Sequence, residues 1–391
     1  MTASVWSAVA SKLAARALGR RFTPPVLHFL VNSVCELRCQ HCFFWRDLED
    51  KGIVDLSLDE VRRIAASLDD LFYLVLAGGE PYLRPDLFEI VETFVRGNAL
   101  SRLVVISDGW GTERIVATAT RILEAFPDLH FTACTSLDGL EPVHDEIRGR
   151  AGSFARAVAT VRRLQALKAR FPRLAVQTLT TYMSLNEAHA EPLYAWLRDE
   201  LRPDKIGLNL IRQDPRNPAT KAVDVRGYER LARRIADDTL AGRRSNRYPG
   251  DAGAVTAIDL VMHDLVAKTA RTGRCQLTCE AGVETGVLYS DGRLATCEIL
   301  EPLGNLRDHG YDVRALWHSR EADAARRRIR AGCRCTHESS MLASIPFNAK
   351  LIPKLVSLQA KVMMAGSARA GGGGGGHGQG HGQGETDLCA S

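Results

Sequence analysis

The chain has 391 residues, of which 45% are hydrophobic and 25% charged, and its net charge is +5. This length accommodates one large domain and a smaller one. A nucleic-acid-binding face needs clustered Lys and Arg. The mild net charge does not indicate such a face, so we expect no nucleic-acid partner. No apolar run reaches the ~18 residues of a membrane-spanning helix. We therefore expect a soluble, cytoplasmic protein.

Both ends of the chain contain basic amphipathic segments. The first 21 residues include four basic residues and no acidic one. Trp6, Val9, Leu13 and Ala17 recur at helical spacing, which predicts a helix within residues 1–24. A similar pattern predicts a helix over 346–364. Each helix either packs on the main domain or contacts a membrane surface, and the first could also be a transit peptide.

Six short apolar runs alternate with helical patterns between residues 25 and 211. The runs cover residues 26–32, 72–76, 102–107, 129–136, 174–181 and 205–211. Strands that alternate with helices form βα units around a parallel sheet. The sequence thus predicts an α/β fold, a partial (β/α)6 TIM-like barrel, with its active site at the C-terminal ends of the strands.

The rest of the chain divides by composition. We expect a helical connector over 212–260, a small cysteine-rich domain over 261–345 and a disordered Gly-rich tail over 365–391. The ten cysteines are grouped tightly, which suits metal or cluster binding better than a disulfide framework. Two cysteines stand apart from the groups: Cys134 is expected in the core, and Cys389 belongs to the tail.

Three cysteines follow the first predicted strand at CxxxCxxC spacing, namely Cys35, Cys39 and Cys42. Iron–sulfur clusters usually take four Cys thiolates, so three on one loop leave one iron without a protein ligand. Zinc is the alternative, although zinc sites usually show two cysteine or histidine pairs. The motif resembles that of the radical S-adenosylmethionine (radical SAM) superfamily. The resemblance implies that the methionine part of SAM binds the open iron, and that reductive cleavage gives a 5′-deoxyadenosyl radical, which takes a hydrogen atom from a substrate.

Further segments resemble the SAM-binding motifs of this superfamily. Gly78, Gly79 and Glu80 follow the second strand, where the family binds the amino group of SAM and where the Glu80 charge suits an ammonium. Ser107 follows the third strand, at the place of a Thr/Ser-Asn-Gly turn. Asp108 replaces the Asn, and we expect it to be a turn residue, with a polar contact to SAM as the alternative.

The fourth strand is followed by Ser136-Leu-Asp138-Gly and then by His-Asp145-Glu-Ile-Arg148-Gly. In relatives with an auxiliary cluster domain, the Ser and Asp at this position contact SAM, and the resemblance implies this role for Ser136 and Asp138. Arg148 would pair either with the SAM carboxylate or with Asp145. His41, inside the cysteine loop, occupies the position that approaches the adenine.

A second cysteine group resembles the SPASM/twitch auxiliary domain, in which a β-hairpin separates the first cysteines of a cluster. The pattern Gly-Val-Leu-Tyr-Ser-Asp-Gly-Arg-Leu-Ala over 286–295 predicts such a hairpin. The group comprises Cys275, Cys279, Cys297, Cys333 and Cys335. Two fully ligated clusters would need about eight thiols, so we expect one auxiliary 4Fe–4S cluster with one spare thiol. Cys275 is our candidate for the spare, and zinc is the alternative metal.

The resemblance implies an oxidoreductase that uses SAM and a reducing partner such as flavodoxin or ferredoxin. We expect oxidative modification of a peptide or protein. The alternative is a small molecule, such as a sugar or antibiotic precursor, or a lipid. A different class, a non-catalytic iron–sulfur electron carrier, would need none of the SAM motifs. No general base is assigned, and Arg212 and Asp214 are candidates only by their position after the last barrel strand.

Overall fold

The computed structural model describes residues 5–243 and 252–371. Within these residues, the strands form one sheet in the order β6-β5-β4-β3-β2-β1-β7-β8-β9. The strands are β1 Val26–Leu30, β2 Tyr73–Ala77, β3 Arg102–Ser107, β4 His130–Ser136, β5 Leu174–Tyr182, β6 Lys205–Leu210, β7 Thr285–Leu288, β8 Arg293–Ala295 and β9 Gly304–Asn305. Strands β1 to β6 all pair in parallel. The six predicted strands and the partial barrel are therefore confirmed.

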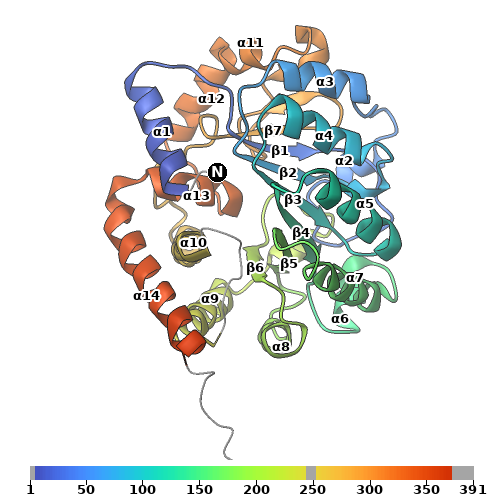
Figure 1. Ribbon diagram of the computed structural model, residues 1–391, viewed down its shortest axis with the longest axis vertical. Helices are drawn as coiled ribbons and strands as arrows, with labels where there is room; N and C mark the ends of the chain where they lie inside the picture. Colours follow the sequence, from blue (N-terminus) through green and yellow to red (C-terminus); the bar gives the residue numbers. More distant parts are fainter. Residues whose placement is uncertain (1–4, 244–251, 372–391) are drawn as a thin grey trace, which may run out of the picture.

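Helices cover the sheet on both sides, as Figure 1 shows. The helices α3, α4, α5 and α7 lie along one side, and α9, α10 and α14 lie on the other. Their bounds are α1 Val5–Ala17, α2 Trp45–Glu49, α3 Leu58–Ala66, α4 Leu87–Gly97, α5 Thr112–Ala125, α6 Val143–Arg148, α7 Ser153–Leu167, α8 Ala190–Trp196, α9 Val225–Leu240, α10 Ala252–Thr272, α11 Val313–Trp317, α12 Arg320–Arg330, α13 Glu338–Ser344 and α14 Ile352–Gly371.

The two faces of the barrel strands have different roles. Outward side chains such as Leu27 and Phe29 belong to the main hydrophobic core with the covering helices. Inward side chains at alternate positions, such as Val75 and Val104, line a cavity inside the barrel. Because successive strand residues point to opposite faces, the continuous apolar runs supply both layers at once.

The predicted hairpin over 286–295 is present, since β7 and β8 pair antiparallel. Its turn places Gly292 at φ 93°, a conformation that glycine adopts without strain. We did not predict that β7 would also pair in parallel with β1, with Val26 opposite Thr285. The cysteine-rich region therefore extends the barrel sheet directly, because β1 would otherwise leave an unpaired edge.

The helices at the domain boundaries differ from the expected ranges. The boundary placed between residues 260 and 261 falls inside α10, which continues from the connector into the cysteine-rich region. The helix expected over 346–364 also has other bounds in the structure, where α14 begins at Ile352 and continues to Gly371. Residues 365–371 include Ala, Ser and Arg, which are compatible with a helix, and the helix ends at the start of the glycine run. The rest of the tail, with Cys389, lies outside the described residues.

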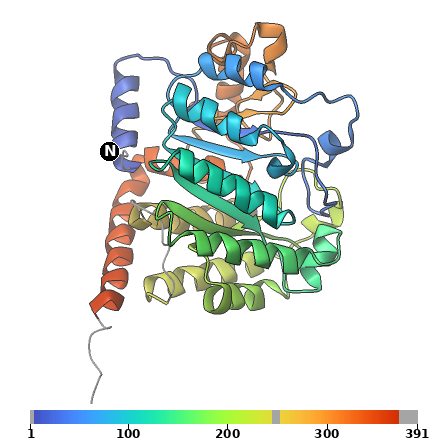
Figure 2. The same ribbon diagram turned by 45° about the vertical axis from the view of Figure 1, so that its right-hand side comes forward.

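Helix α1 packs against the body of the protein. Val9 is buried, and Arg16 pairs with Glu280 at 2.9 Å and also with Glu284. The indole of Trp6 donates to the Gln359 side chain of α14 at 3.0 Å. Figure 2 shows α1 and α14 following one another along the same flank. No helix in the described part of the chain has the length and apolar character needed to cross a bilayer.

Candidate active site

The three loop cysteines lie at the C-terminal end of β1 and line the barrel cavity, which has a volume of about 500 Å³. All three are free thiols, with Cys39 buried and Cys35 and Cys42 half-buried. Burial raises the pKa of the Cys42 thiol to about 11 and raises that of Cys35 as well. Such thiols remain protonated at neutral pH unless a bound metal takes the place of the proton.

Neighbouring backbone segments hold this loop in place. The amide of Gly79 donates to the Asn32 carbonyl at 3.0 Å, and the amide of Glu80 donates to the Val34 carbonyl at 2.8 Å. A Cβ at Gly79 would lie 2.0 Å from the Val34 oxygen, so only glycine fits there. Gly78 and Gly79 both line the cavity, and the missing side chain of Gly79 also makes room for the backbone of the cysteine loop.

The segment after the fourth strand supports the loop from its other side. The Gln40 amide donates to the Ile147 carbonyl at 2.9 Å, and the Arg38 amide donates to the Arg148 carbonyl at 3.3 Å. A Cβ at Gly149 would lie 2.9 Å from the Arg38 oxygen. The His-Asp-Glu-Ile-Arg-Gly segment therefore acts as a backbone support for the three cysteines.

Glu80 is a buried carboxylate at the end of β2. It accepts hydrogen bonds from the Ser107 hydroxyl at 3.0 Å, the Asp108 amide at 2.8 Å and the Tyr82 amide at 3.1 Å. Burial, together with the nearby Asp108 carboxylate, raises the pKa of Glu80 well above its usual value. Two acidic groups are thus forced together at the cavity wall, where a cationic ligand would relieve their repulsion.

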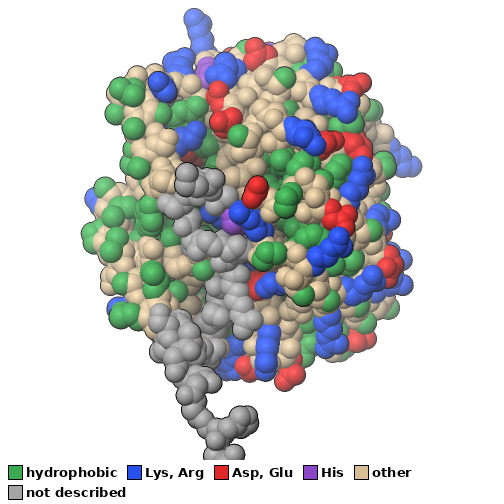
Figure 3. Space-filling view, in the orientation of Figure 1, with side chains coloured by type: hydrophobic (Ala, Val, Ile, Leu, Met, Phe, Trp, Pro, Cys, Tyr) green, Lys and Arg blue, Asp and Glu red, His purple; other side chains and the backbone are tan. Residues whose placement is uncertain are grey.

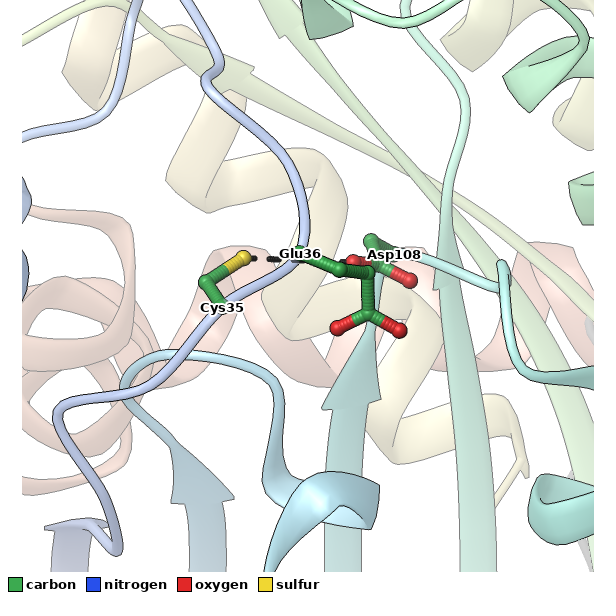
Figure 4. Close-up of side chains that lie close together, drawn as sticks. All are labelled: Cys35, Glu36 and Asp108. Carbon is green, nitrogen blue, oxygen red and sulfur yellow. Dashed lines mark hydrogen bonds between the residues drawn. The ribbon is translucent and has the colours of Figure 1, made fainter.

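Asp108 has a larger role than the turn residue that we predicted. Its Oδ1 accepts from the Trp110 amide at 2.8 Å, as a turn residue would, but its Oδ2 lies 3.9 Å from the Cys35 sulfur. Figure 4 shows Cys35, Glu36 and Asp108 converging, and their ligand atoms all lie within 4.8 Å of one another. Sequence alone could not place Glu36 and Asp108 together, because they are 72 positions apart.

Arg148 and Asp138 form a buried ion pair, with Nη2 of Arg148 2.6 Å from Oδ2 of Asp138. The expected alternative pair between Arg148 and Asp145 is absent from the described contacts, because Asp145 accepts from the Gly152 and Phe154 amides at the start of α7. Burial opposes ionisation of Asp138, yet Arg148 and then His41 hold its pKa below the usual value.

Arg148 lines the cavity and donates to the Cys39 sulfur at 3.6 Å, whereas Asp138 lies behind it, outside the described cavity lining. Asp138 therefore positions Arg148. His41 also lines the cavity, with Nε2 3.7 Å from the Asp138 carboxylate. Burial lowers the pKa of His41 to about 4, so its imidazole is neutral at pH 7. Its buried Nδ1 has no hydrogen-bond partner among the described residues.

A second polar group also borders the cavity, and apart from Arg212 it was not predicted from the sequence. Glu298 directly follows Cys297, and its Oε2 lies 2.8 Å from His337 Nε2 and 3.5 Å from Arg212. Arg212 also pairs with Glu338 at 2.7 Å. Although burial opposes it, His337 and then Arg212 hold the pKa of Glu298 far below its usual value. The available sequence signal was that Glu298 directly follows Cys297 and that Glu338 lies three positions after Cys335.

Arg212 and Asp214, the two candidates named for their position after the last barrel strand, lie in different surroundings. Arg212 lines the cavity, as do Glu298 and Glu338. Asp214 does not: its side chain is 63% exposed and pairs with Arg46 at 2.5 Å, outside the described cavity lining.

The five auxiliary thiols form a separate group beside this network. The Cys275 amide donates to the Cys333 carbonyl at 3.1 Å, and Cys297, Cys279 and Cys333 share one small apolar cluster. Burial, together with the nearby Cys335 and, for Cys297, the Glu298 carboxylate, raises the pKa values of Cys279 and Cys297 to about 12. Cys134 is buried in the barrel interior, as expected for a core residue.

The donor sets fit the cofactors that the sequence indicates. Three free thiols border the same cavity as the Glu80 carboxylate, the Arg148 guanidinium and the open nitrogen of His41. Anionic, cationic and neutral hydrogen-bonding groups thus surround one space, which suits a cofactor that carries an ammonium, a carboxylate and a heterocycle.

Comparisons with known proteins agree with this geometry. Residues 30–197 match the profile of the Radical SAM superfamily. The chain is 34% identical to the pre-heme d1 synthase of Dinoroseobacter shibae over 149 residues, which is 36% of this chain and 34% of that protein. It is 25% identical to the cysteine-type anaerobic sulfatase-maturating enzyme of Clostridium novyi over 292 residues, 68% of this chain and 71% of that protein.

Among solved structures, anSMEcpe with bound AdoMet and Cp18Cys peptide has the same fold. The TM-score is 0.55 at 16% sequence identity, over 86% of this chain and 99% of that one. The match to the first relative spans only about a third of that protein, whereas the structural match spans nearly the whole neighbour. Residues 30–197 are therefore a radical SAM domain, and proteins with this domain use a 4Fe–4S cluster and SAM.

Proposed function

We propose that the protein reductively cleaves SAM and abstracts hydrogen from a substrate held in the barrel cavity. Cys35, Cys39 and Cys42 would hold a 4Fe–4S cluster that, when bound, supplies the electron for SAM cleavage and the resulting 5′-deoxyadenosyl radical. The observation that carries this proposal is that the three thiols border one cavity with Glu80 and Arg148.

The surrounding side chains supply complementary charges for SAM. The Glu80 carboxylate, fixed by two backbone amides and the Ser107 hydroxyl, would face the ammonium group. Arg148, held by Asp138, would face the carboxylate, and such charge-assisted contacts are the stronger hydrogen bonds. Ser136 and His41 line the same cavity and would contact the nucleoside part.

For the auxiliary group we propose one 4Fe–4S cluster. Cys279, Cys297 and Cys333 already meet in one small apolar cluster, and four Cys thiolates are the usual ligand set of an iron–sulfur cluster. Zinc bound by the same thiols is the alternative.

Cys275 remains our candidate for the spare thiol. Its sulfur donates to the Leu277 carbonyl at 3.3 Å, and only a protonated thiol can donate there. Cys279, Cys297, Cys333 and Cys335 would then be the ligands.

The network next to the auxiliary group suits an oxidation. A substrate that has lost a hydrogen atom must also lose an electron and a proton to form an oxidised product. The auxiliary cluster would accept the electron. The proton would pass to Glu338, a buried carboxylate at the cavity wall whose pKa is raised by burial.

We propose a peptide or protein as the substrate. Two proteins that resemble this chain support this choice, since one is named a sulfatase-maturating enzyme and the other has a bound peptide. A small molecule or a lipid is the alternative substrate class. We further propose that the enzyme works in the cytoplasm with a flavodoxin- or ferredoxin-type reductant.

The test is anaerobic reconstitution with iron and sulfide, followed by SAM and dithionite. We expect release of 5′-deoxyadenosine and methionine, and about eight irons per chain from two clusters. Cys39→Ala should abolish release and lower the iron to about four. SAM that stays intact beside fully loaded clusters would instead identify an electron carrier. About four irons with one zinc would refute the auxiliary cluster.

A further inference from the structure

The helices α1 and α14 carry most of the exposed apolar side chains of the protein. Of the nine large hydrophobic residues that are exposed in the described part of the chain, five lie on or directly after these two helices. They are Leu13, Leu18, Val356, Met363 and Met364, at 47% to 73% exposure. Such a concentration on one flank exceeds the scattered exposed residues of an ordinary surface.

These side chains lie on continuous helix faces. In α14, the exposed residues Pro353, Val356, Ala360 and Met363 follow at intervals of three and four, which places them on one face. In α1, the exposed Ala10, Leu13, Ala14 and Ala17 do the same. The opposite faces pack inward, where Val9 and Leu355 are buried. Each helix therefore has an outward apolar face in addition to its core face.

The two outward faces belong to the same flank of the molecule. Trp6 of α1 is hydrogen-bonded to Gln359 of α14, and both views of the ribbon show the helices along one edge. Figure 3 shows hydrophobic side chains gathered along this edge. We refer to α1 and α14 with residues 18–21 and 349–351 as the helical flank.

The charges on the helical flank have a single sign. Residues 1–22 and 345–371 contain no Asp or Glu. Arg20, Arg21, Lys350 and Lys361 are exposed, and no ion pair of theirs is recorded among the described residues. Lys354 is paired with Asp264 at 3.0 Å, and Arg16 with Glu280, so these two are already neutralised.

We propose that the helical flank binds the surface of an anionic phospholipid bilayer. Apolar faces flanked by Lys and Arg lie in the headgroup region of such a bilayer, and anionic lipids attract the basic residues. A second copy of the chain is a poorer occupant, because two copies packed through this flank would bring like charges together without an acidic partner.

This attachment would place the membrane close to the barrel. Val5, Ala8 and Val9 of α1 and Phe347, which precedes α14, also line the cavity of the candidate active site. The inference is independent of SAM cleavage, because it rests on the outer faces of the two helices.

The test is co-sedimentation of the full-length protein with vesicles. We expect binding to 3:1 phosphatidylcholine–phosphatidylglycerol vesicles and at least tenfold weaker binding to pure phosphatidylcholine. Raising the salt from 0.1 M to 1 M shortens the screening length from about 10 Å to about 3 Å and should release most of the protein.

Two variants separate the charges from the apolar contacts. Each basic residue at an anionic surface changes binding about five-fold, so Arg20→Gln with Arg21→Gln should weaken it by roughly thirty-fold. Val356→Ser with Met363→Ser and Met364→Ser should weaken it about tenfold or more. Val54→Ser is the matched control, since Val54 is 66% exposed away from this flank. Circular dichroism and iron content should show that all variants are folded.

Equal binding to neutral and anionic vesicles, or no binding to either, would overturn the proposal. A concentration-dependent dimer that the apolar variant abolishes would also overturn it, because the flank would then be a subunit interface. The lipid and salt dependence of the unmodified protein decides the question even if a variant fails to fold.

Discussion

Glu80→Gln should weaken SAM binding without weakening the fold. The carboxylate is buried, it accepts three hydrogen bonds, and burial and Asp108 raise its pKa. Because the pKa of Glu80 is raised in the folded protein, the folded protein favours the protonated form of this acid. Its ionisation therefore removes stability as the pH rises above the unfolded value of ~4.3. Gln is neutral at every pH, so the Glu80→Gln protein does not lose this stability at pH 7.

The magnitudes follow from the contacts. Gln keeps an acceptor oxygen for one of the Asp108 and Tyr82 amides, but its NH2 group cannot accept from the other, and a buried amide left without an acceptor costs ~1–3 kcal/mol. Relief of the repulsion with Asp108 offsets this cost. SAM, in contrast, loses a charge-assisted hydrogen bond worth roughly 1.5–3 kcal/mol, which raises its Kd about 10- to 150-fold.

Calorimetry measures both quantities on the reconstituted protein under anaerobic conditions. We expect an unchanged or higher Tm without SAM and a Kd for SAM raised at least tenfold. Glu113→Gln is the matched control, because the Glu113 side chain is 83% exposed on α5 and only pairs with Arg163. A Glu80→Gln protein that melts several degrees lower yet binds SAM normally would refute the reasoning, since Glu80 would then be a structural residue.

Three further predictions concern the buried ion pair, a buried histidine and the spare thiol. Arg148→Met should destabilise the protein by ~3–5 kcal/mol in urea unfolding, because Asp138 stays buried without its cation, and Asp138→Asn in the same chain should restore much of the loss. If the double variant is no more stable than the single one, the pair is not the cause. Burial lowers the pKa of His144 to about 4, so the unfolded chain binds more protons than the folded chain between about pH 6.5 and 4, and stability falls as the pH falls. His144→Gln should make this slope shallower by up to about 1.4 kcal/mol per pH unit, and an unchanged slope would contradict the assignment. Cys275→Ser should retain about eight irons whereas Cys297→Ser should retain about four, and the reverse pattern would show that Cys275 is a ligand.

The sequence was sufficient for the barrel because local patterns specify it. Each barrel strand is a short apolar run, and each run needs only its own residues to be recognised. The hairpin at 286–295 also has a local signal, because Gly292 permits the turn. No local sequence signal indicates which strand the hairpin will pair with. Pairing of β7 with β1 joins residues more than 250 positions apart, and an apolar pattern does not say which strand will be the neighbour.

The site was predictable in its motifs but not in its pairings. The cysteines were recognised by their spacing, Glu80 and Arg148 by the resemblance of their segments to radical SAM motifs, and the structure brings all five residues to one cavity. The partner of Arg148 was not found, because Asp145 is nearer in sequence but is committed to capping α7. Glu298 and His337 are 39 positions apart, so their contact appears only in the fold.

The most direct test of the account is Mössbauer spectroscopy of the protein reconstituted with ⁵⁷Fe, before and after SAM is added. Three thiols on the 35–42 loop leave one iron of that cluster open, so we predict that a single iron site changes its isomer shift on SAM addition. This change should be absent in Cys39→Ala. An unchanged spectrum at saturating SAM would show that the cluster has no open iron and would contradict the account.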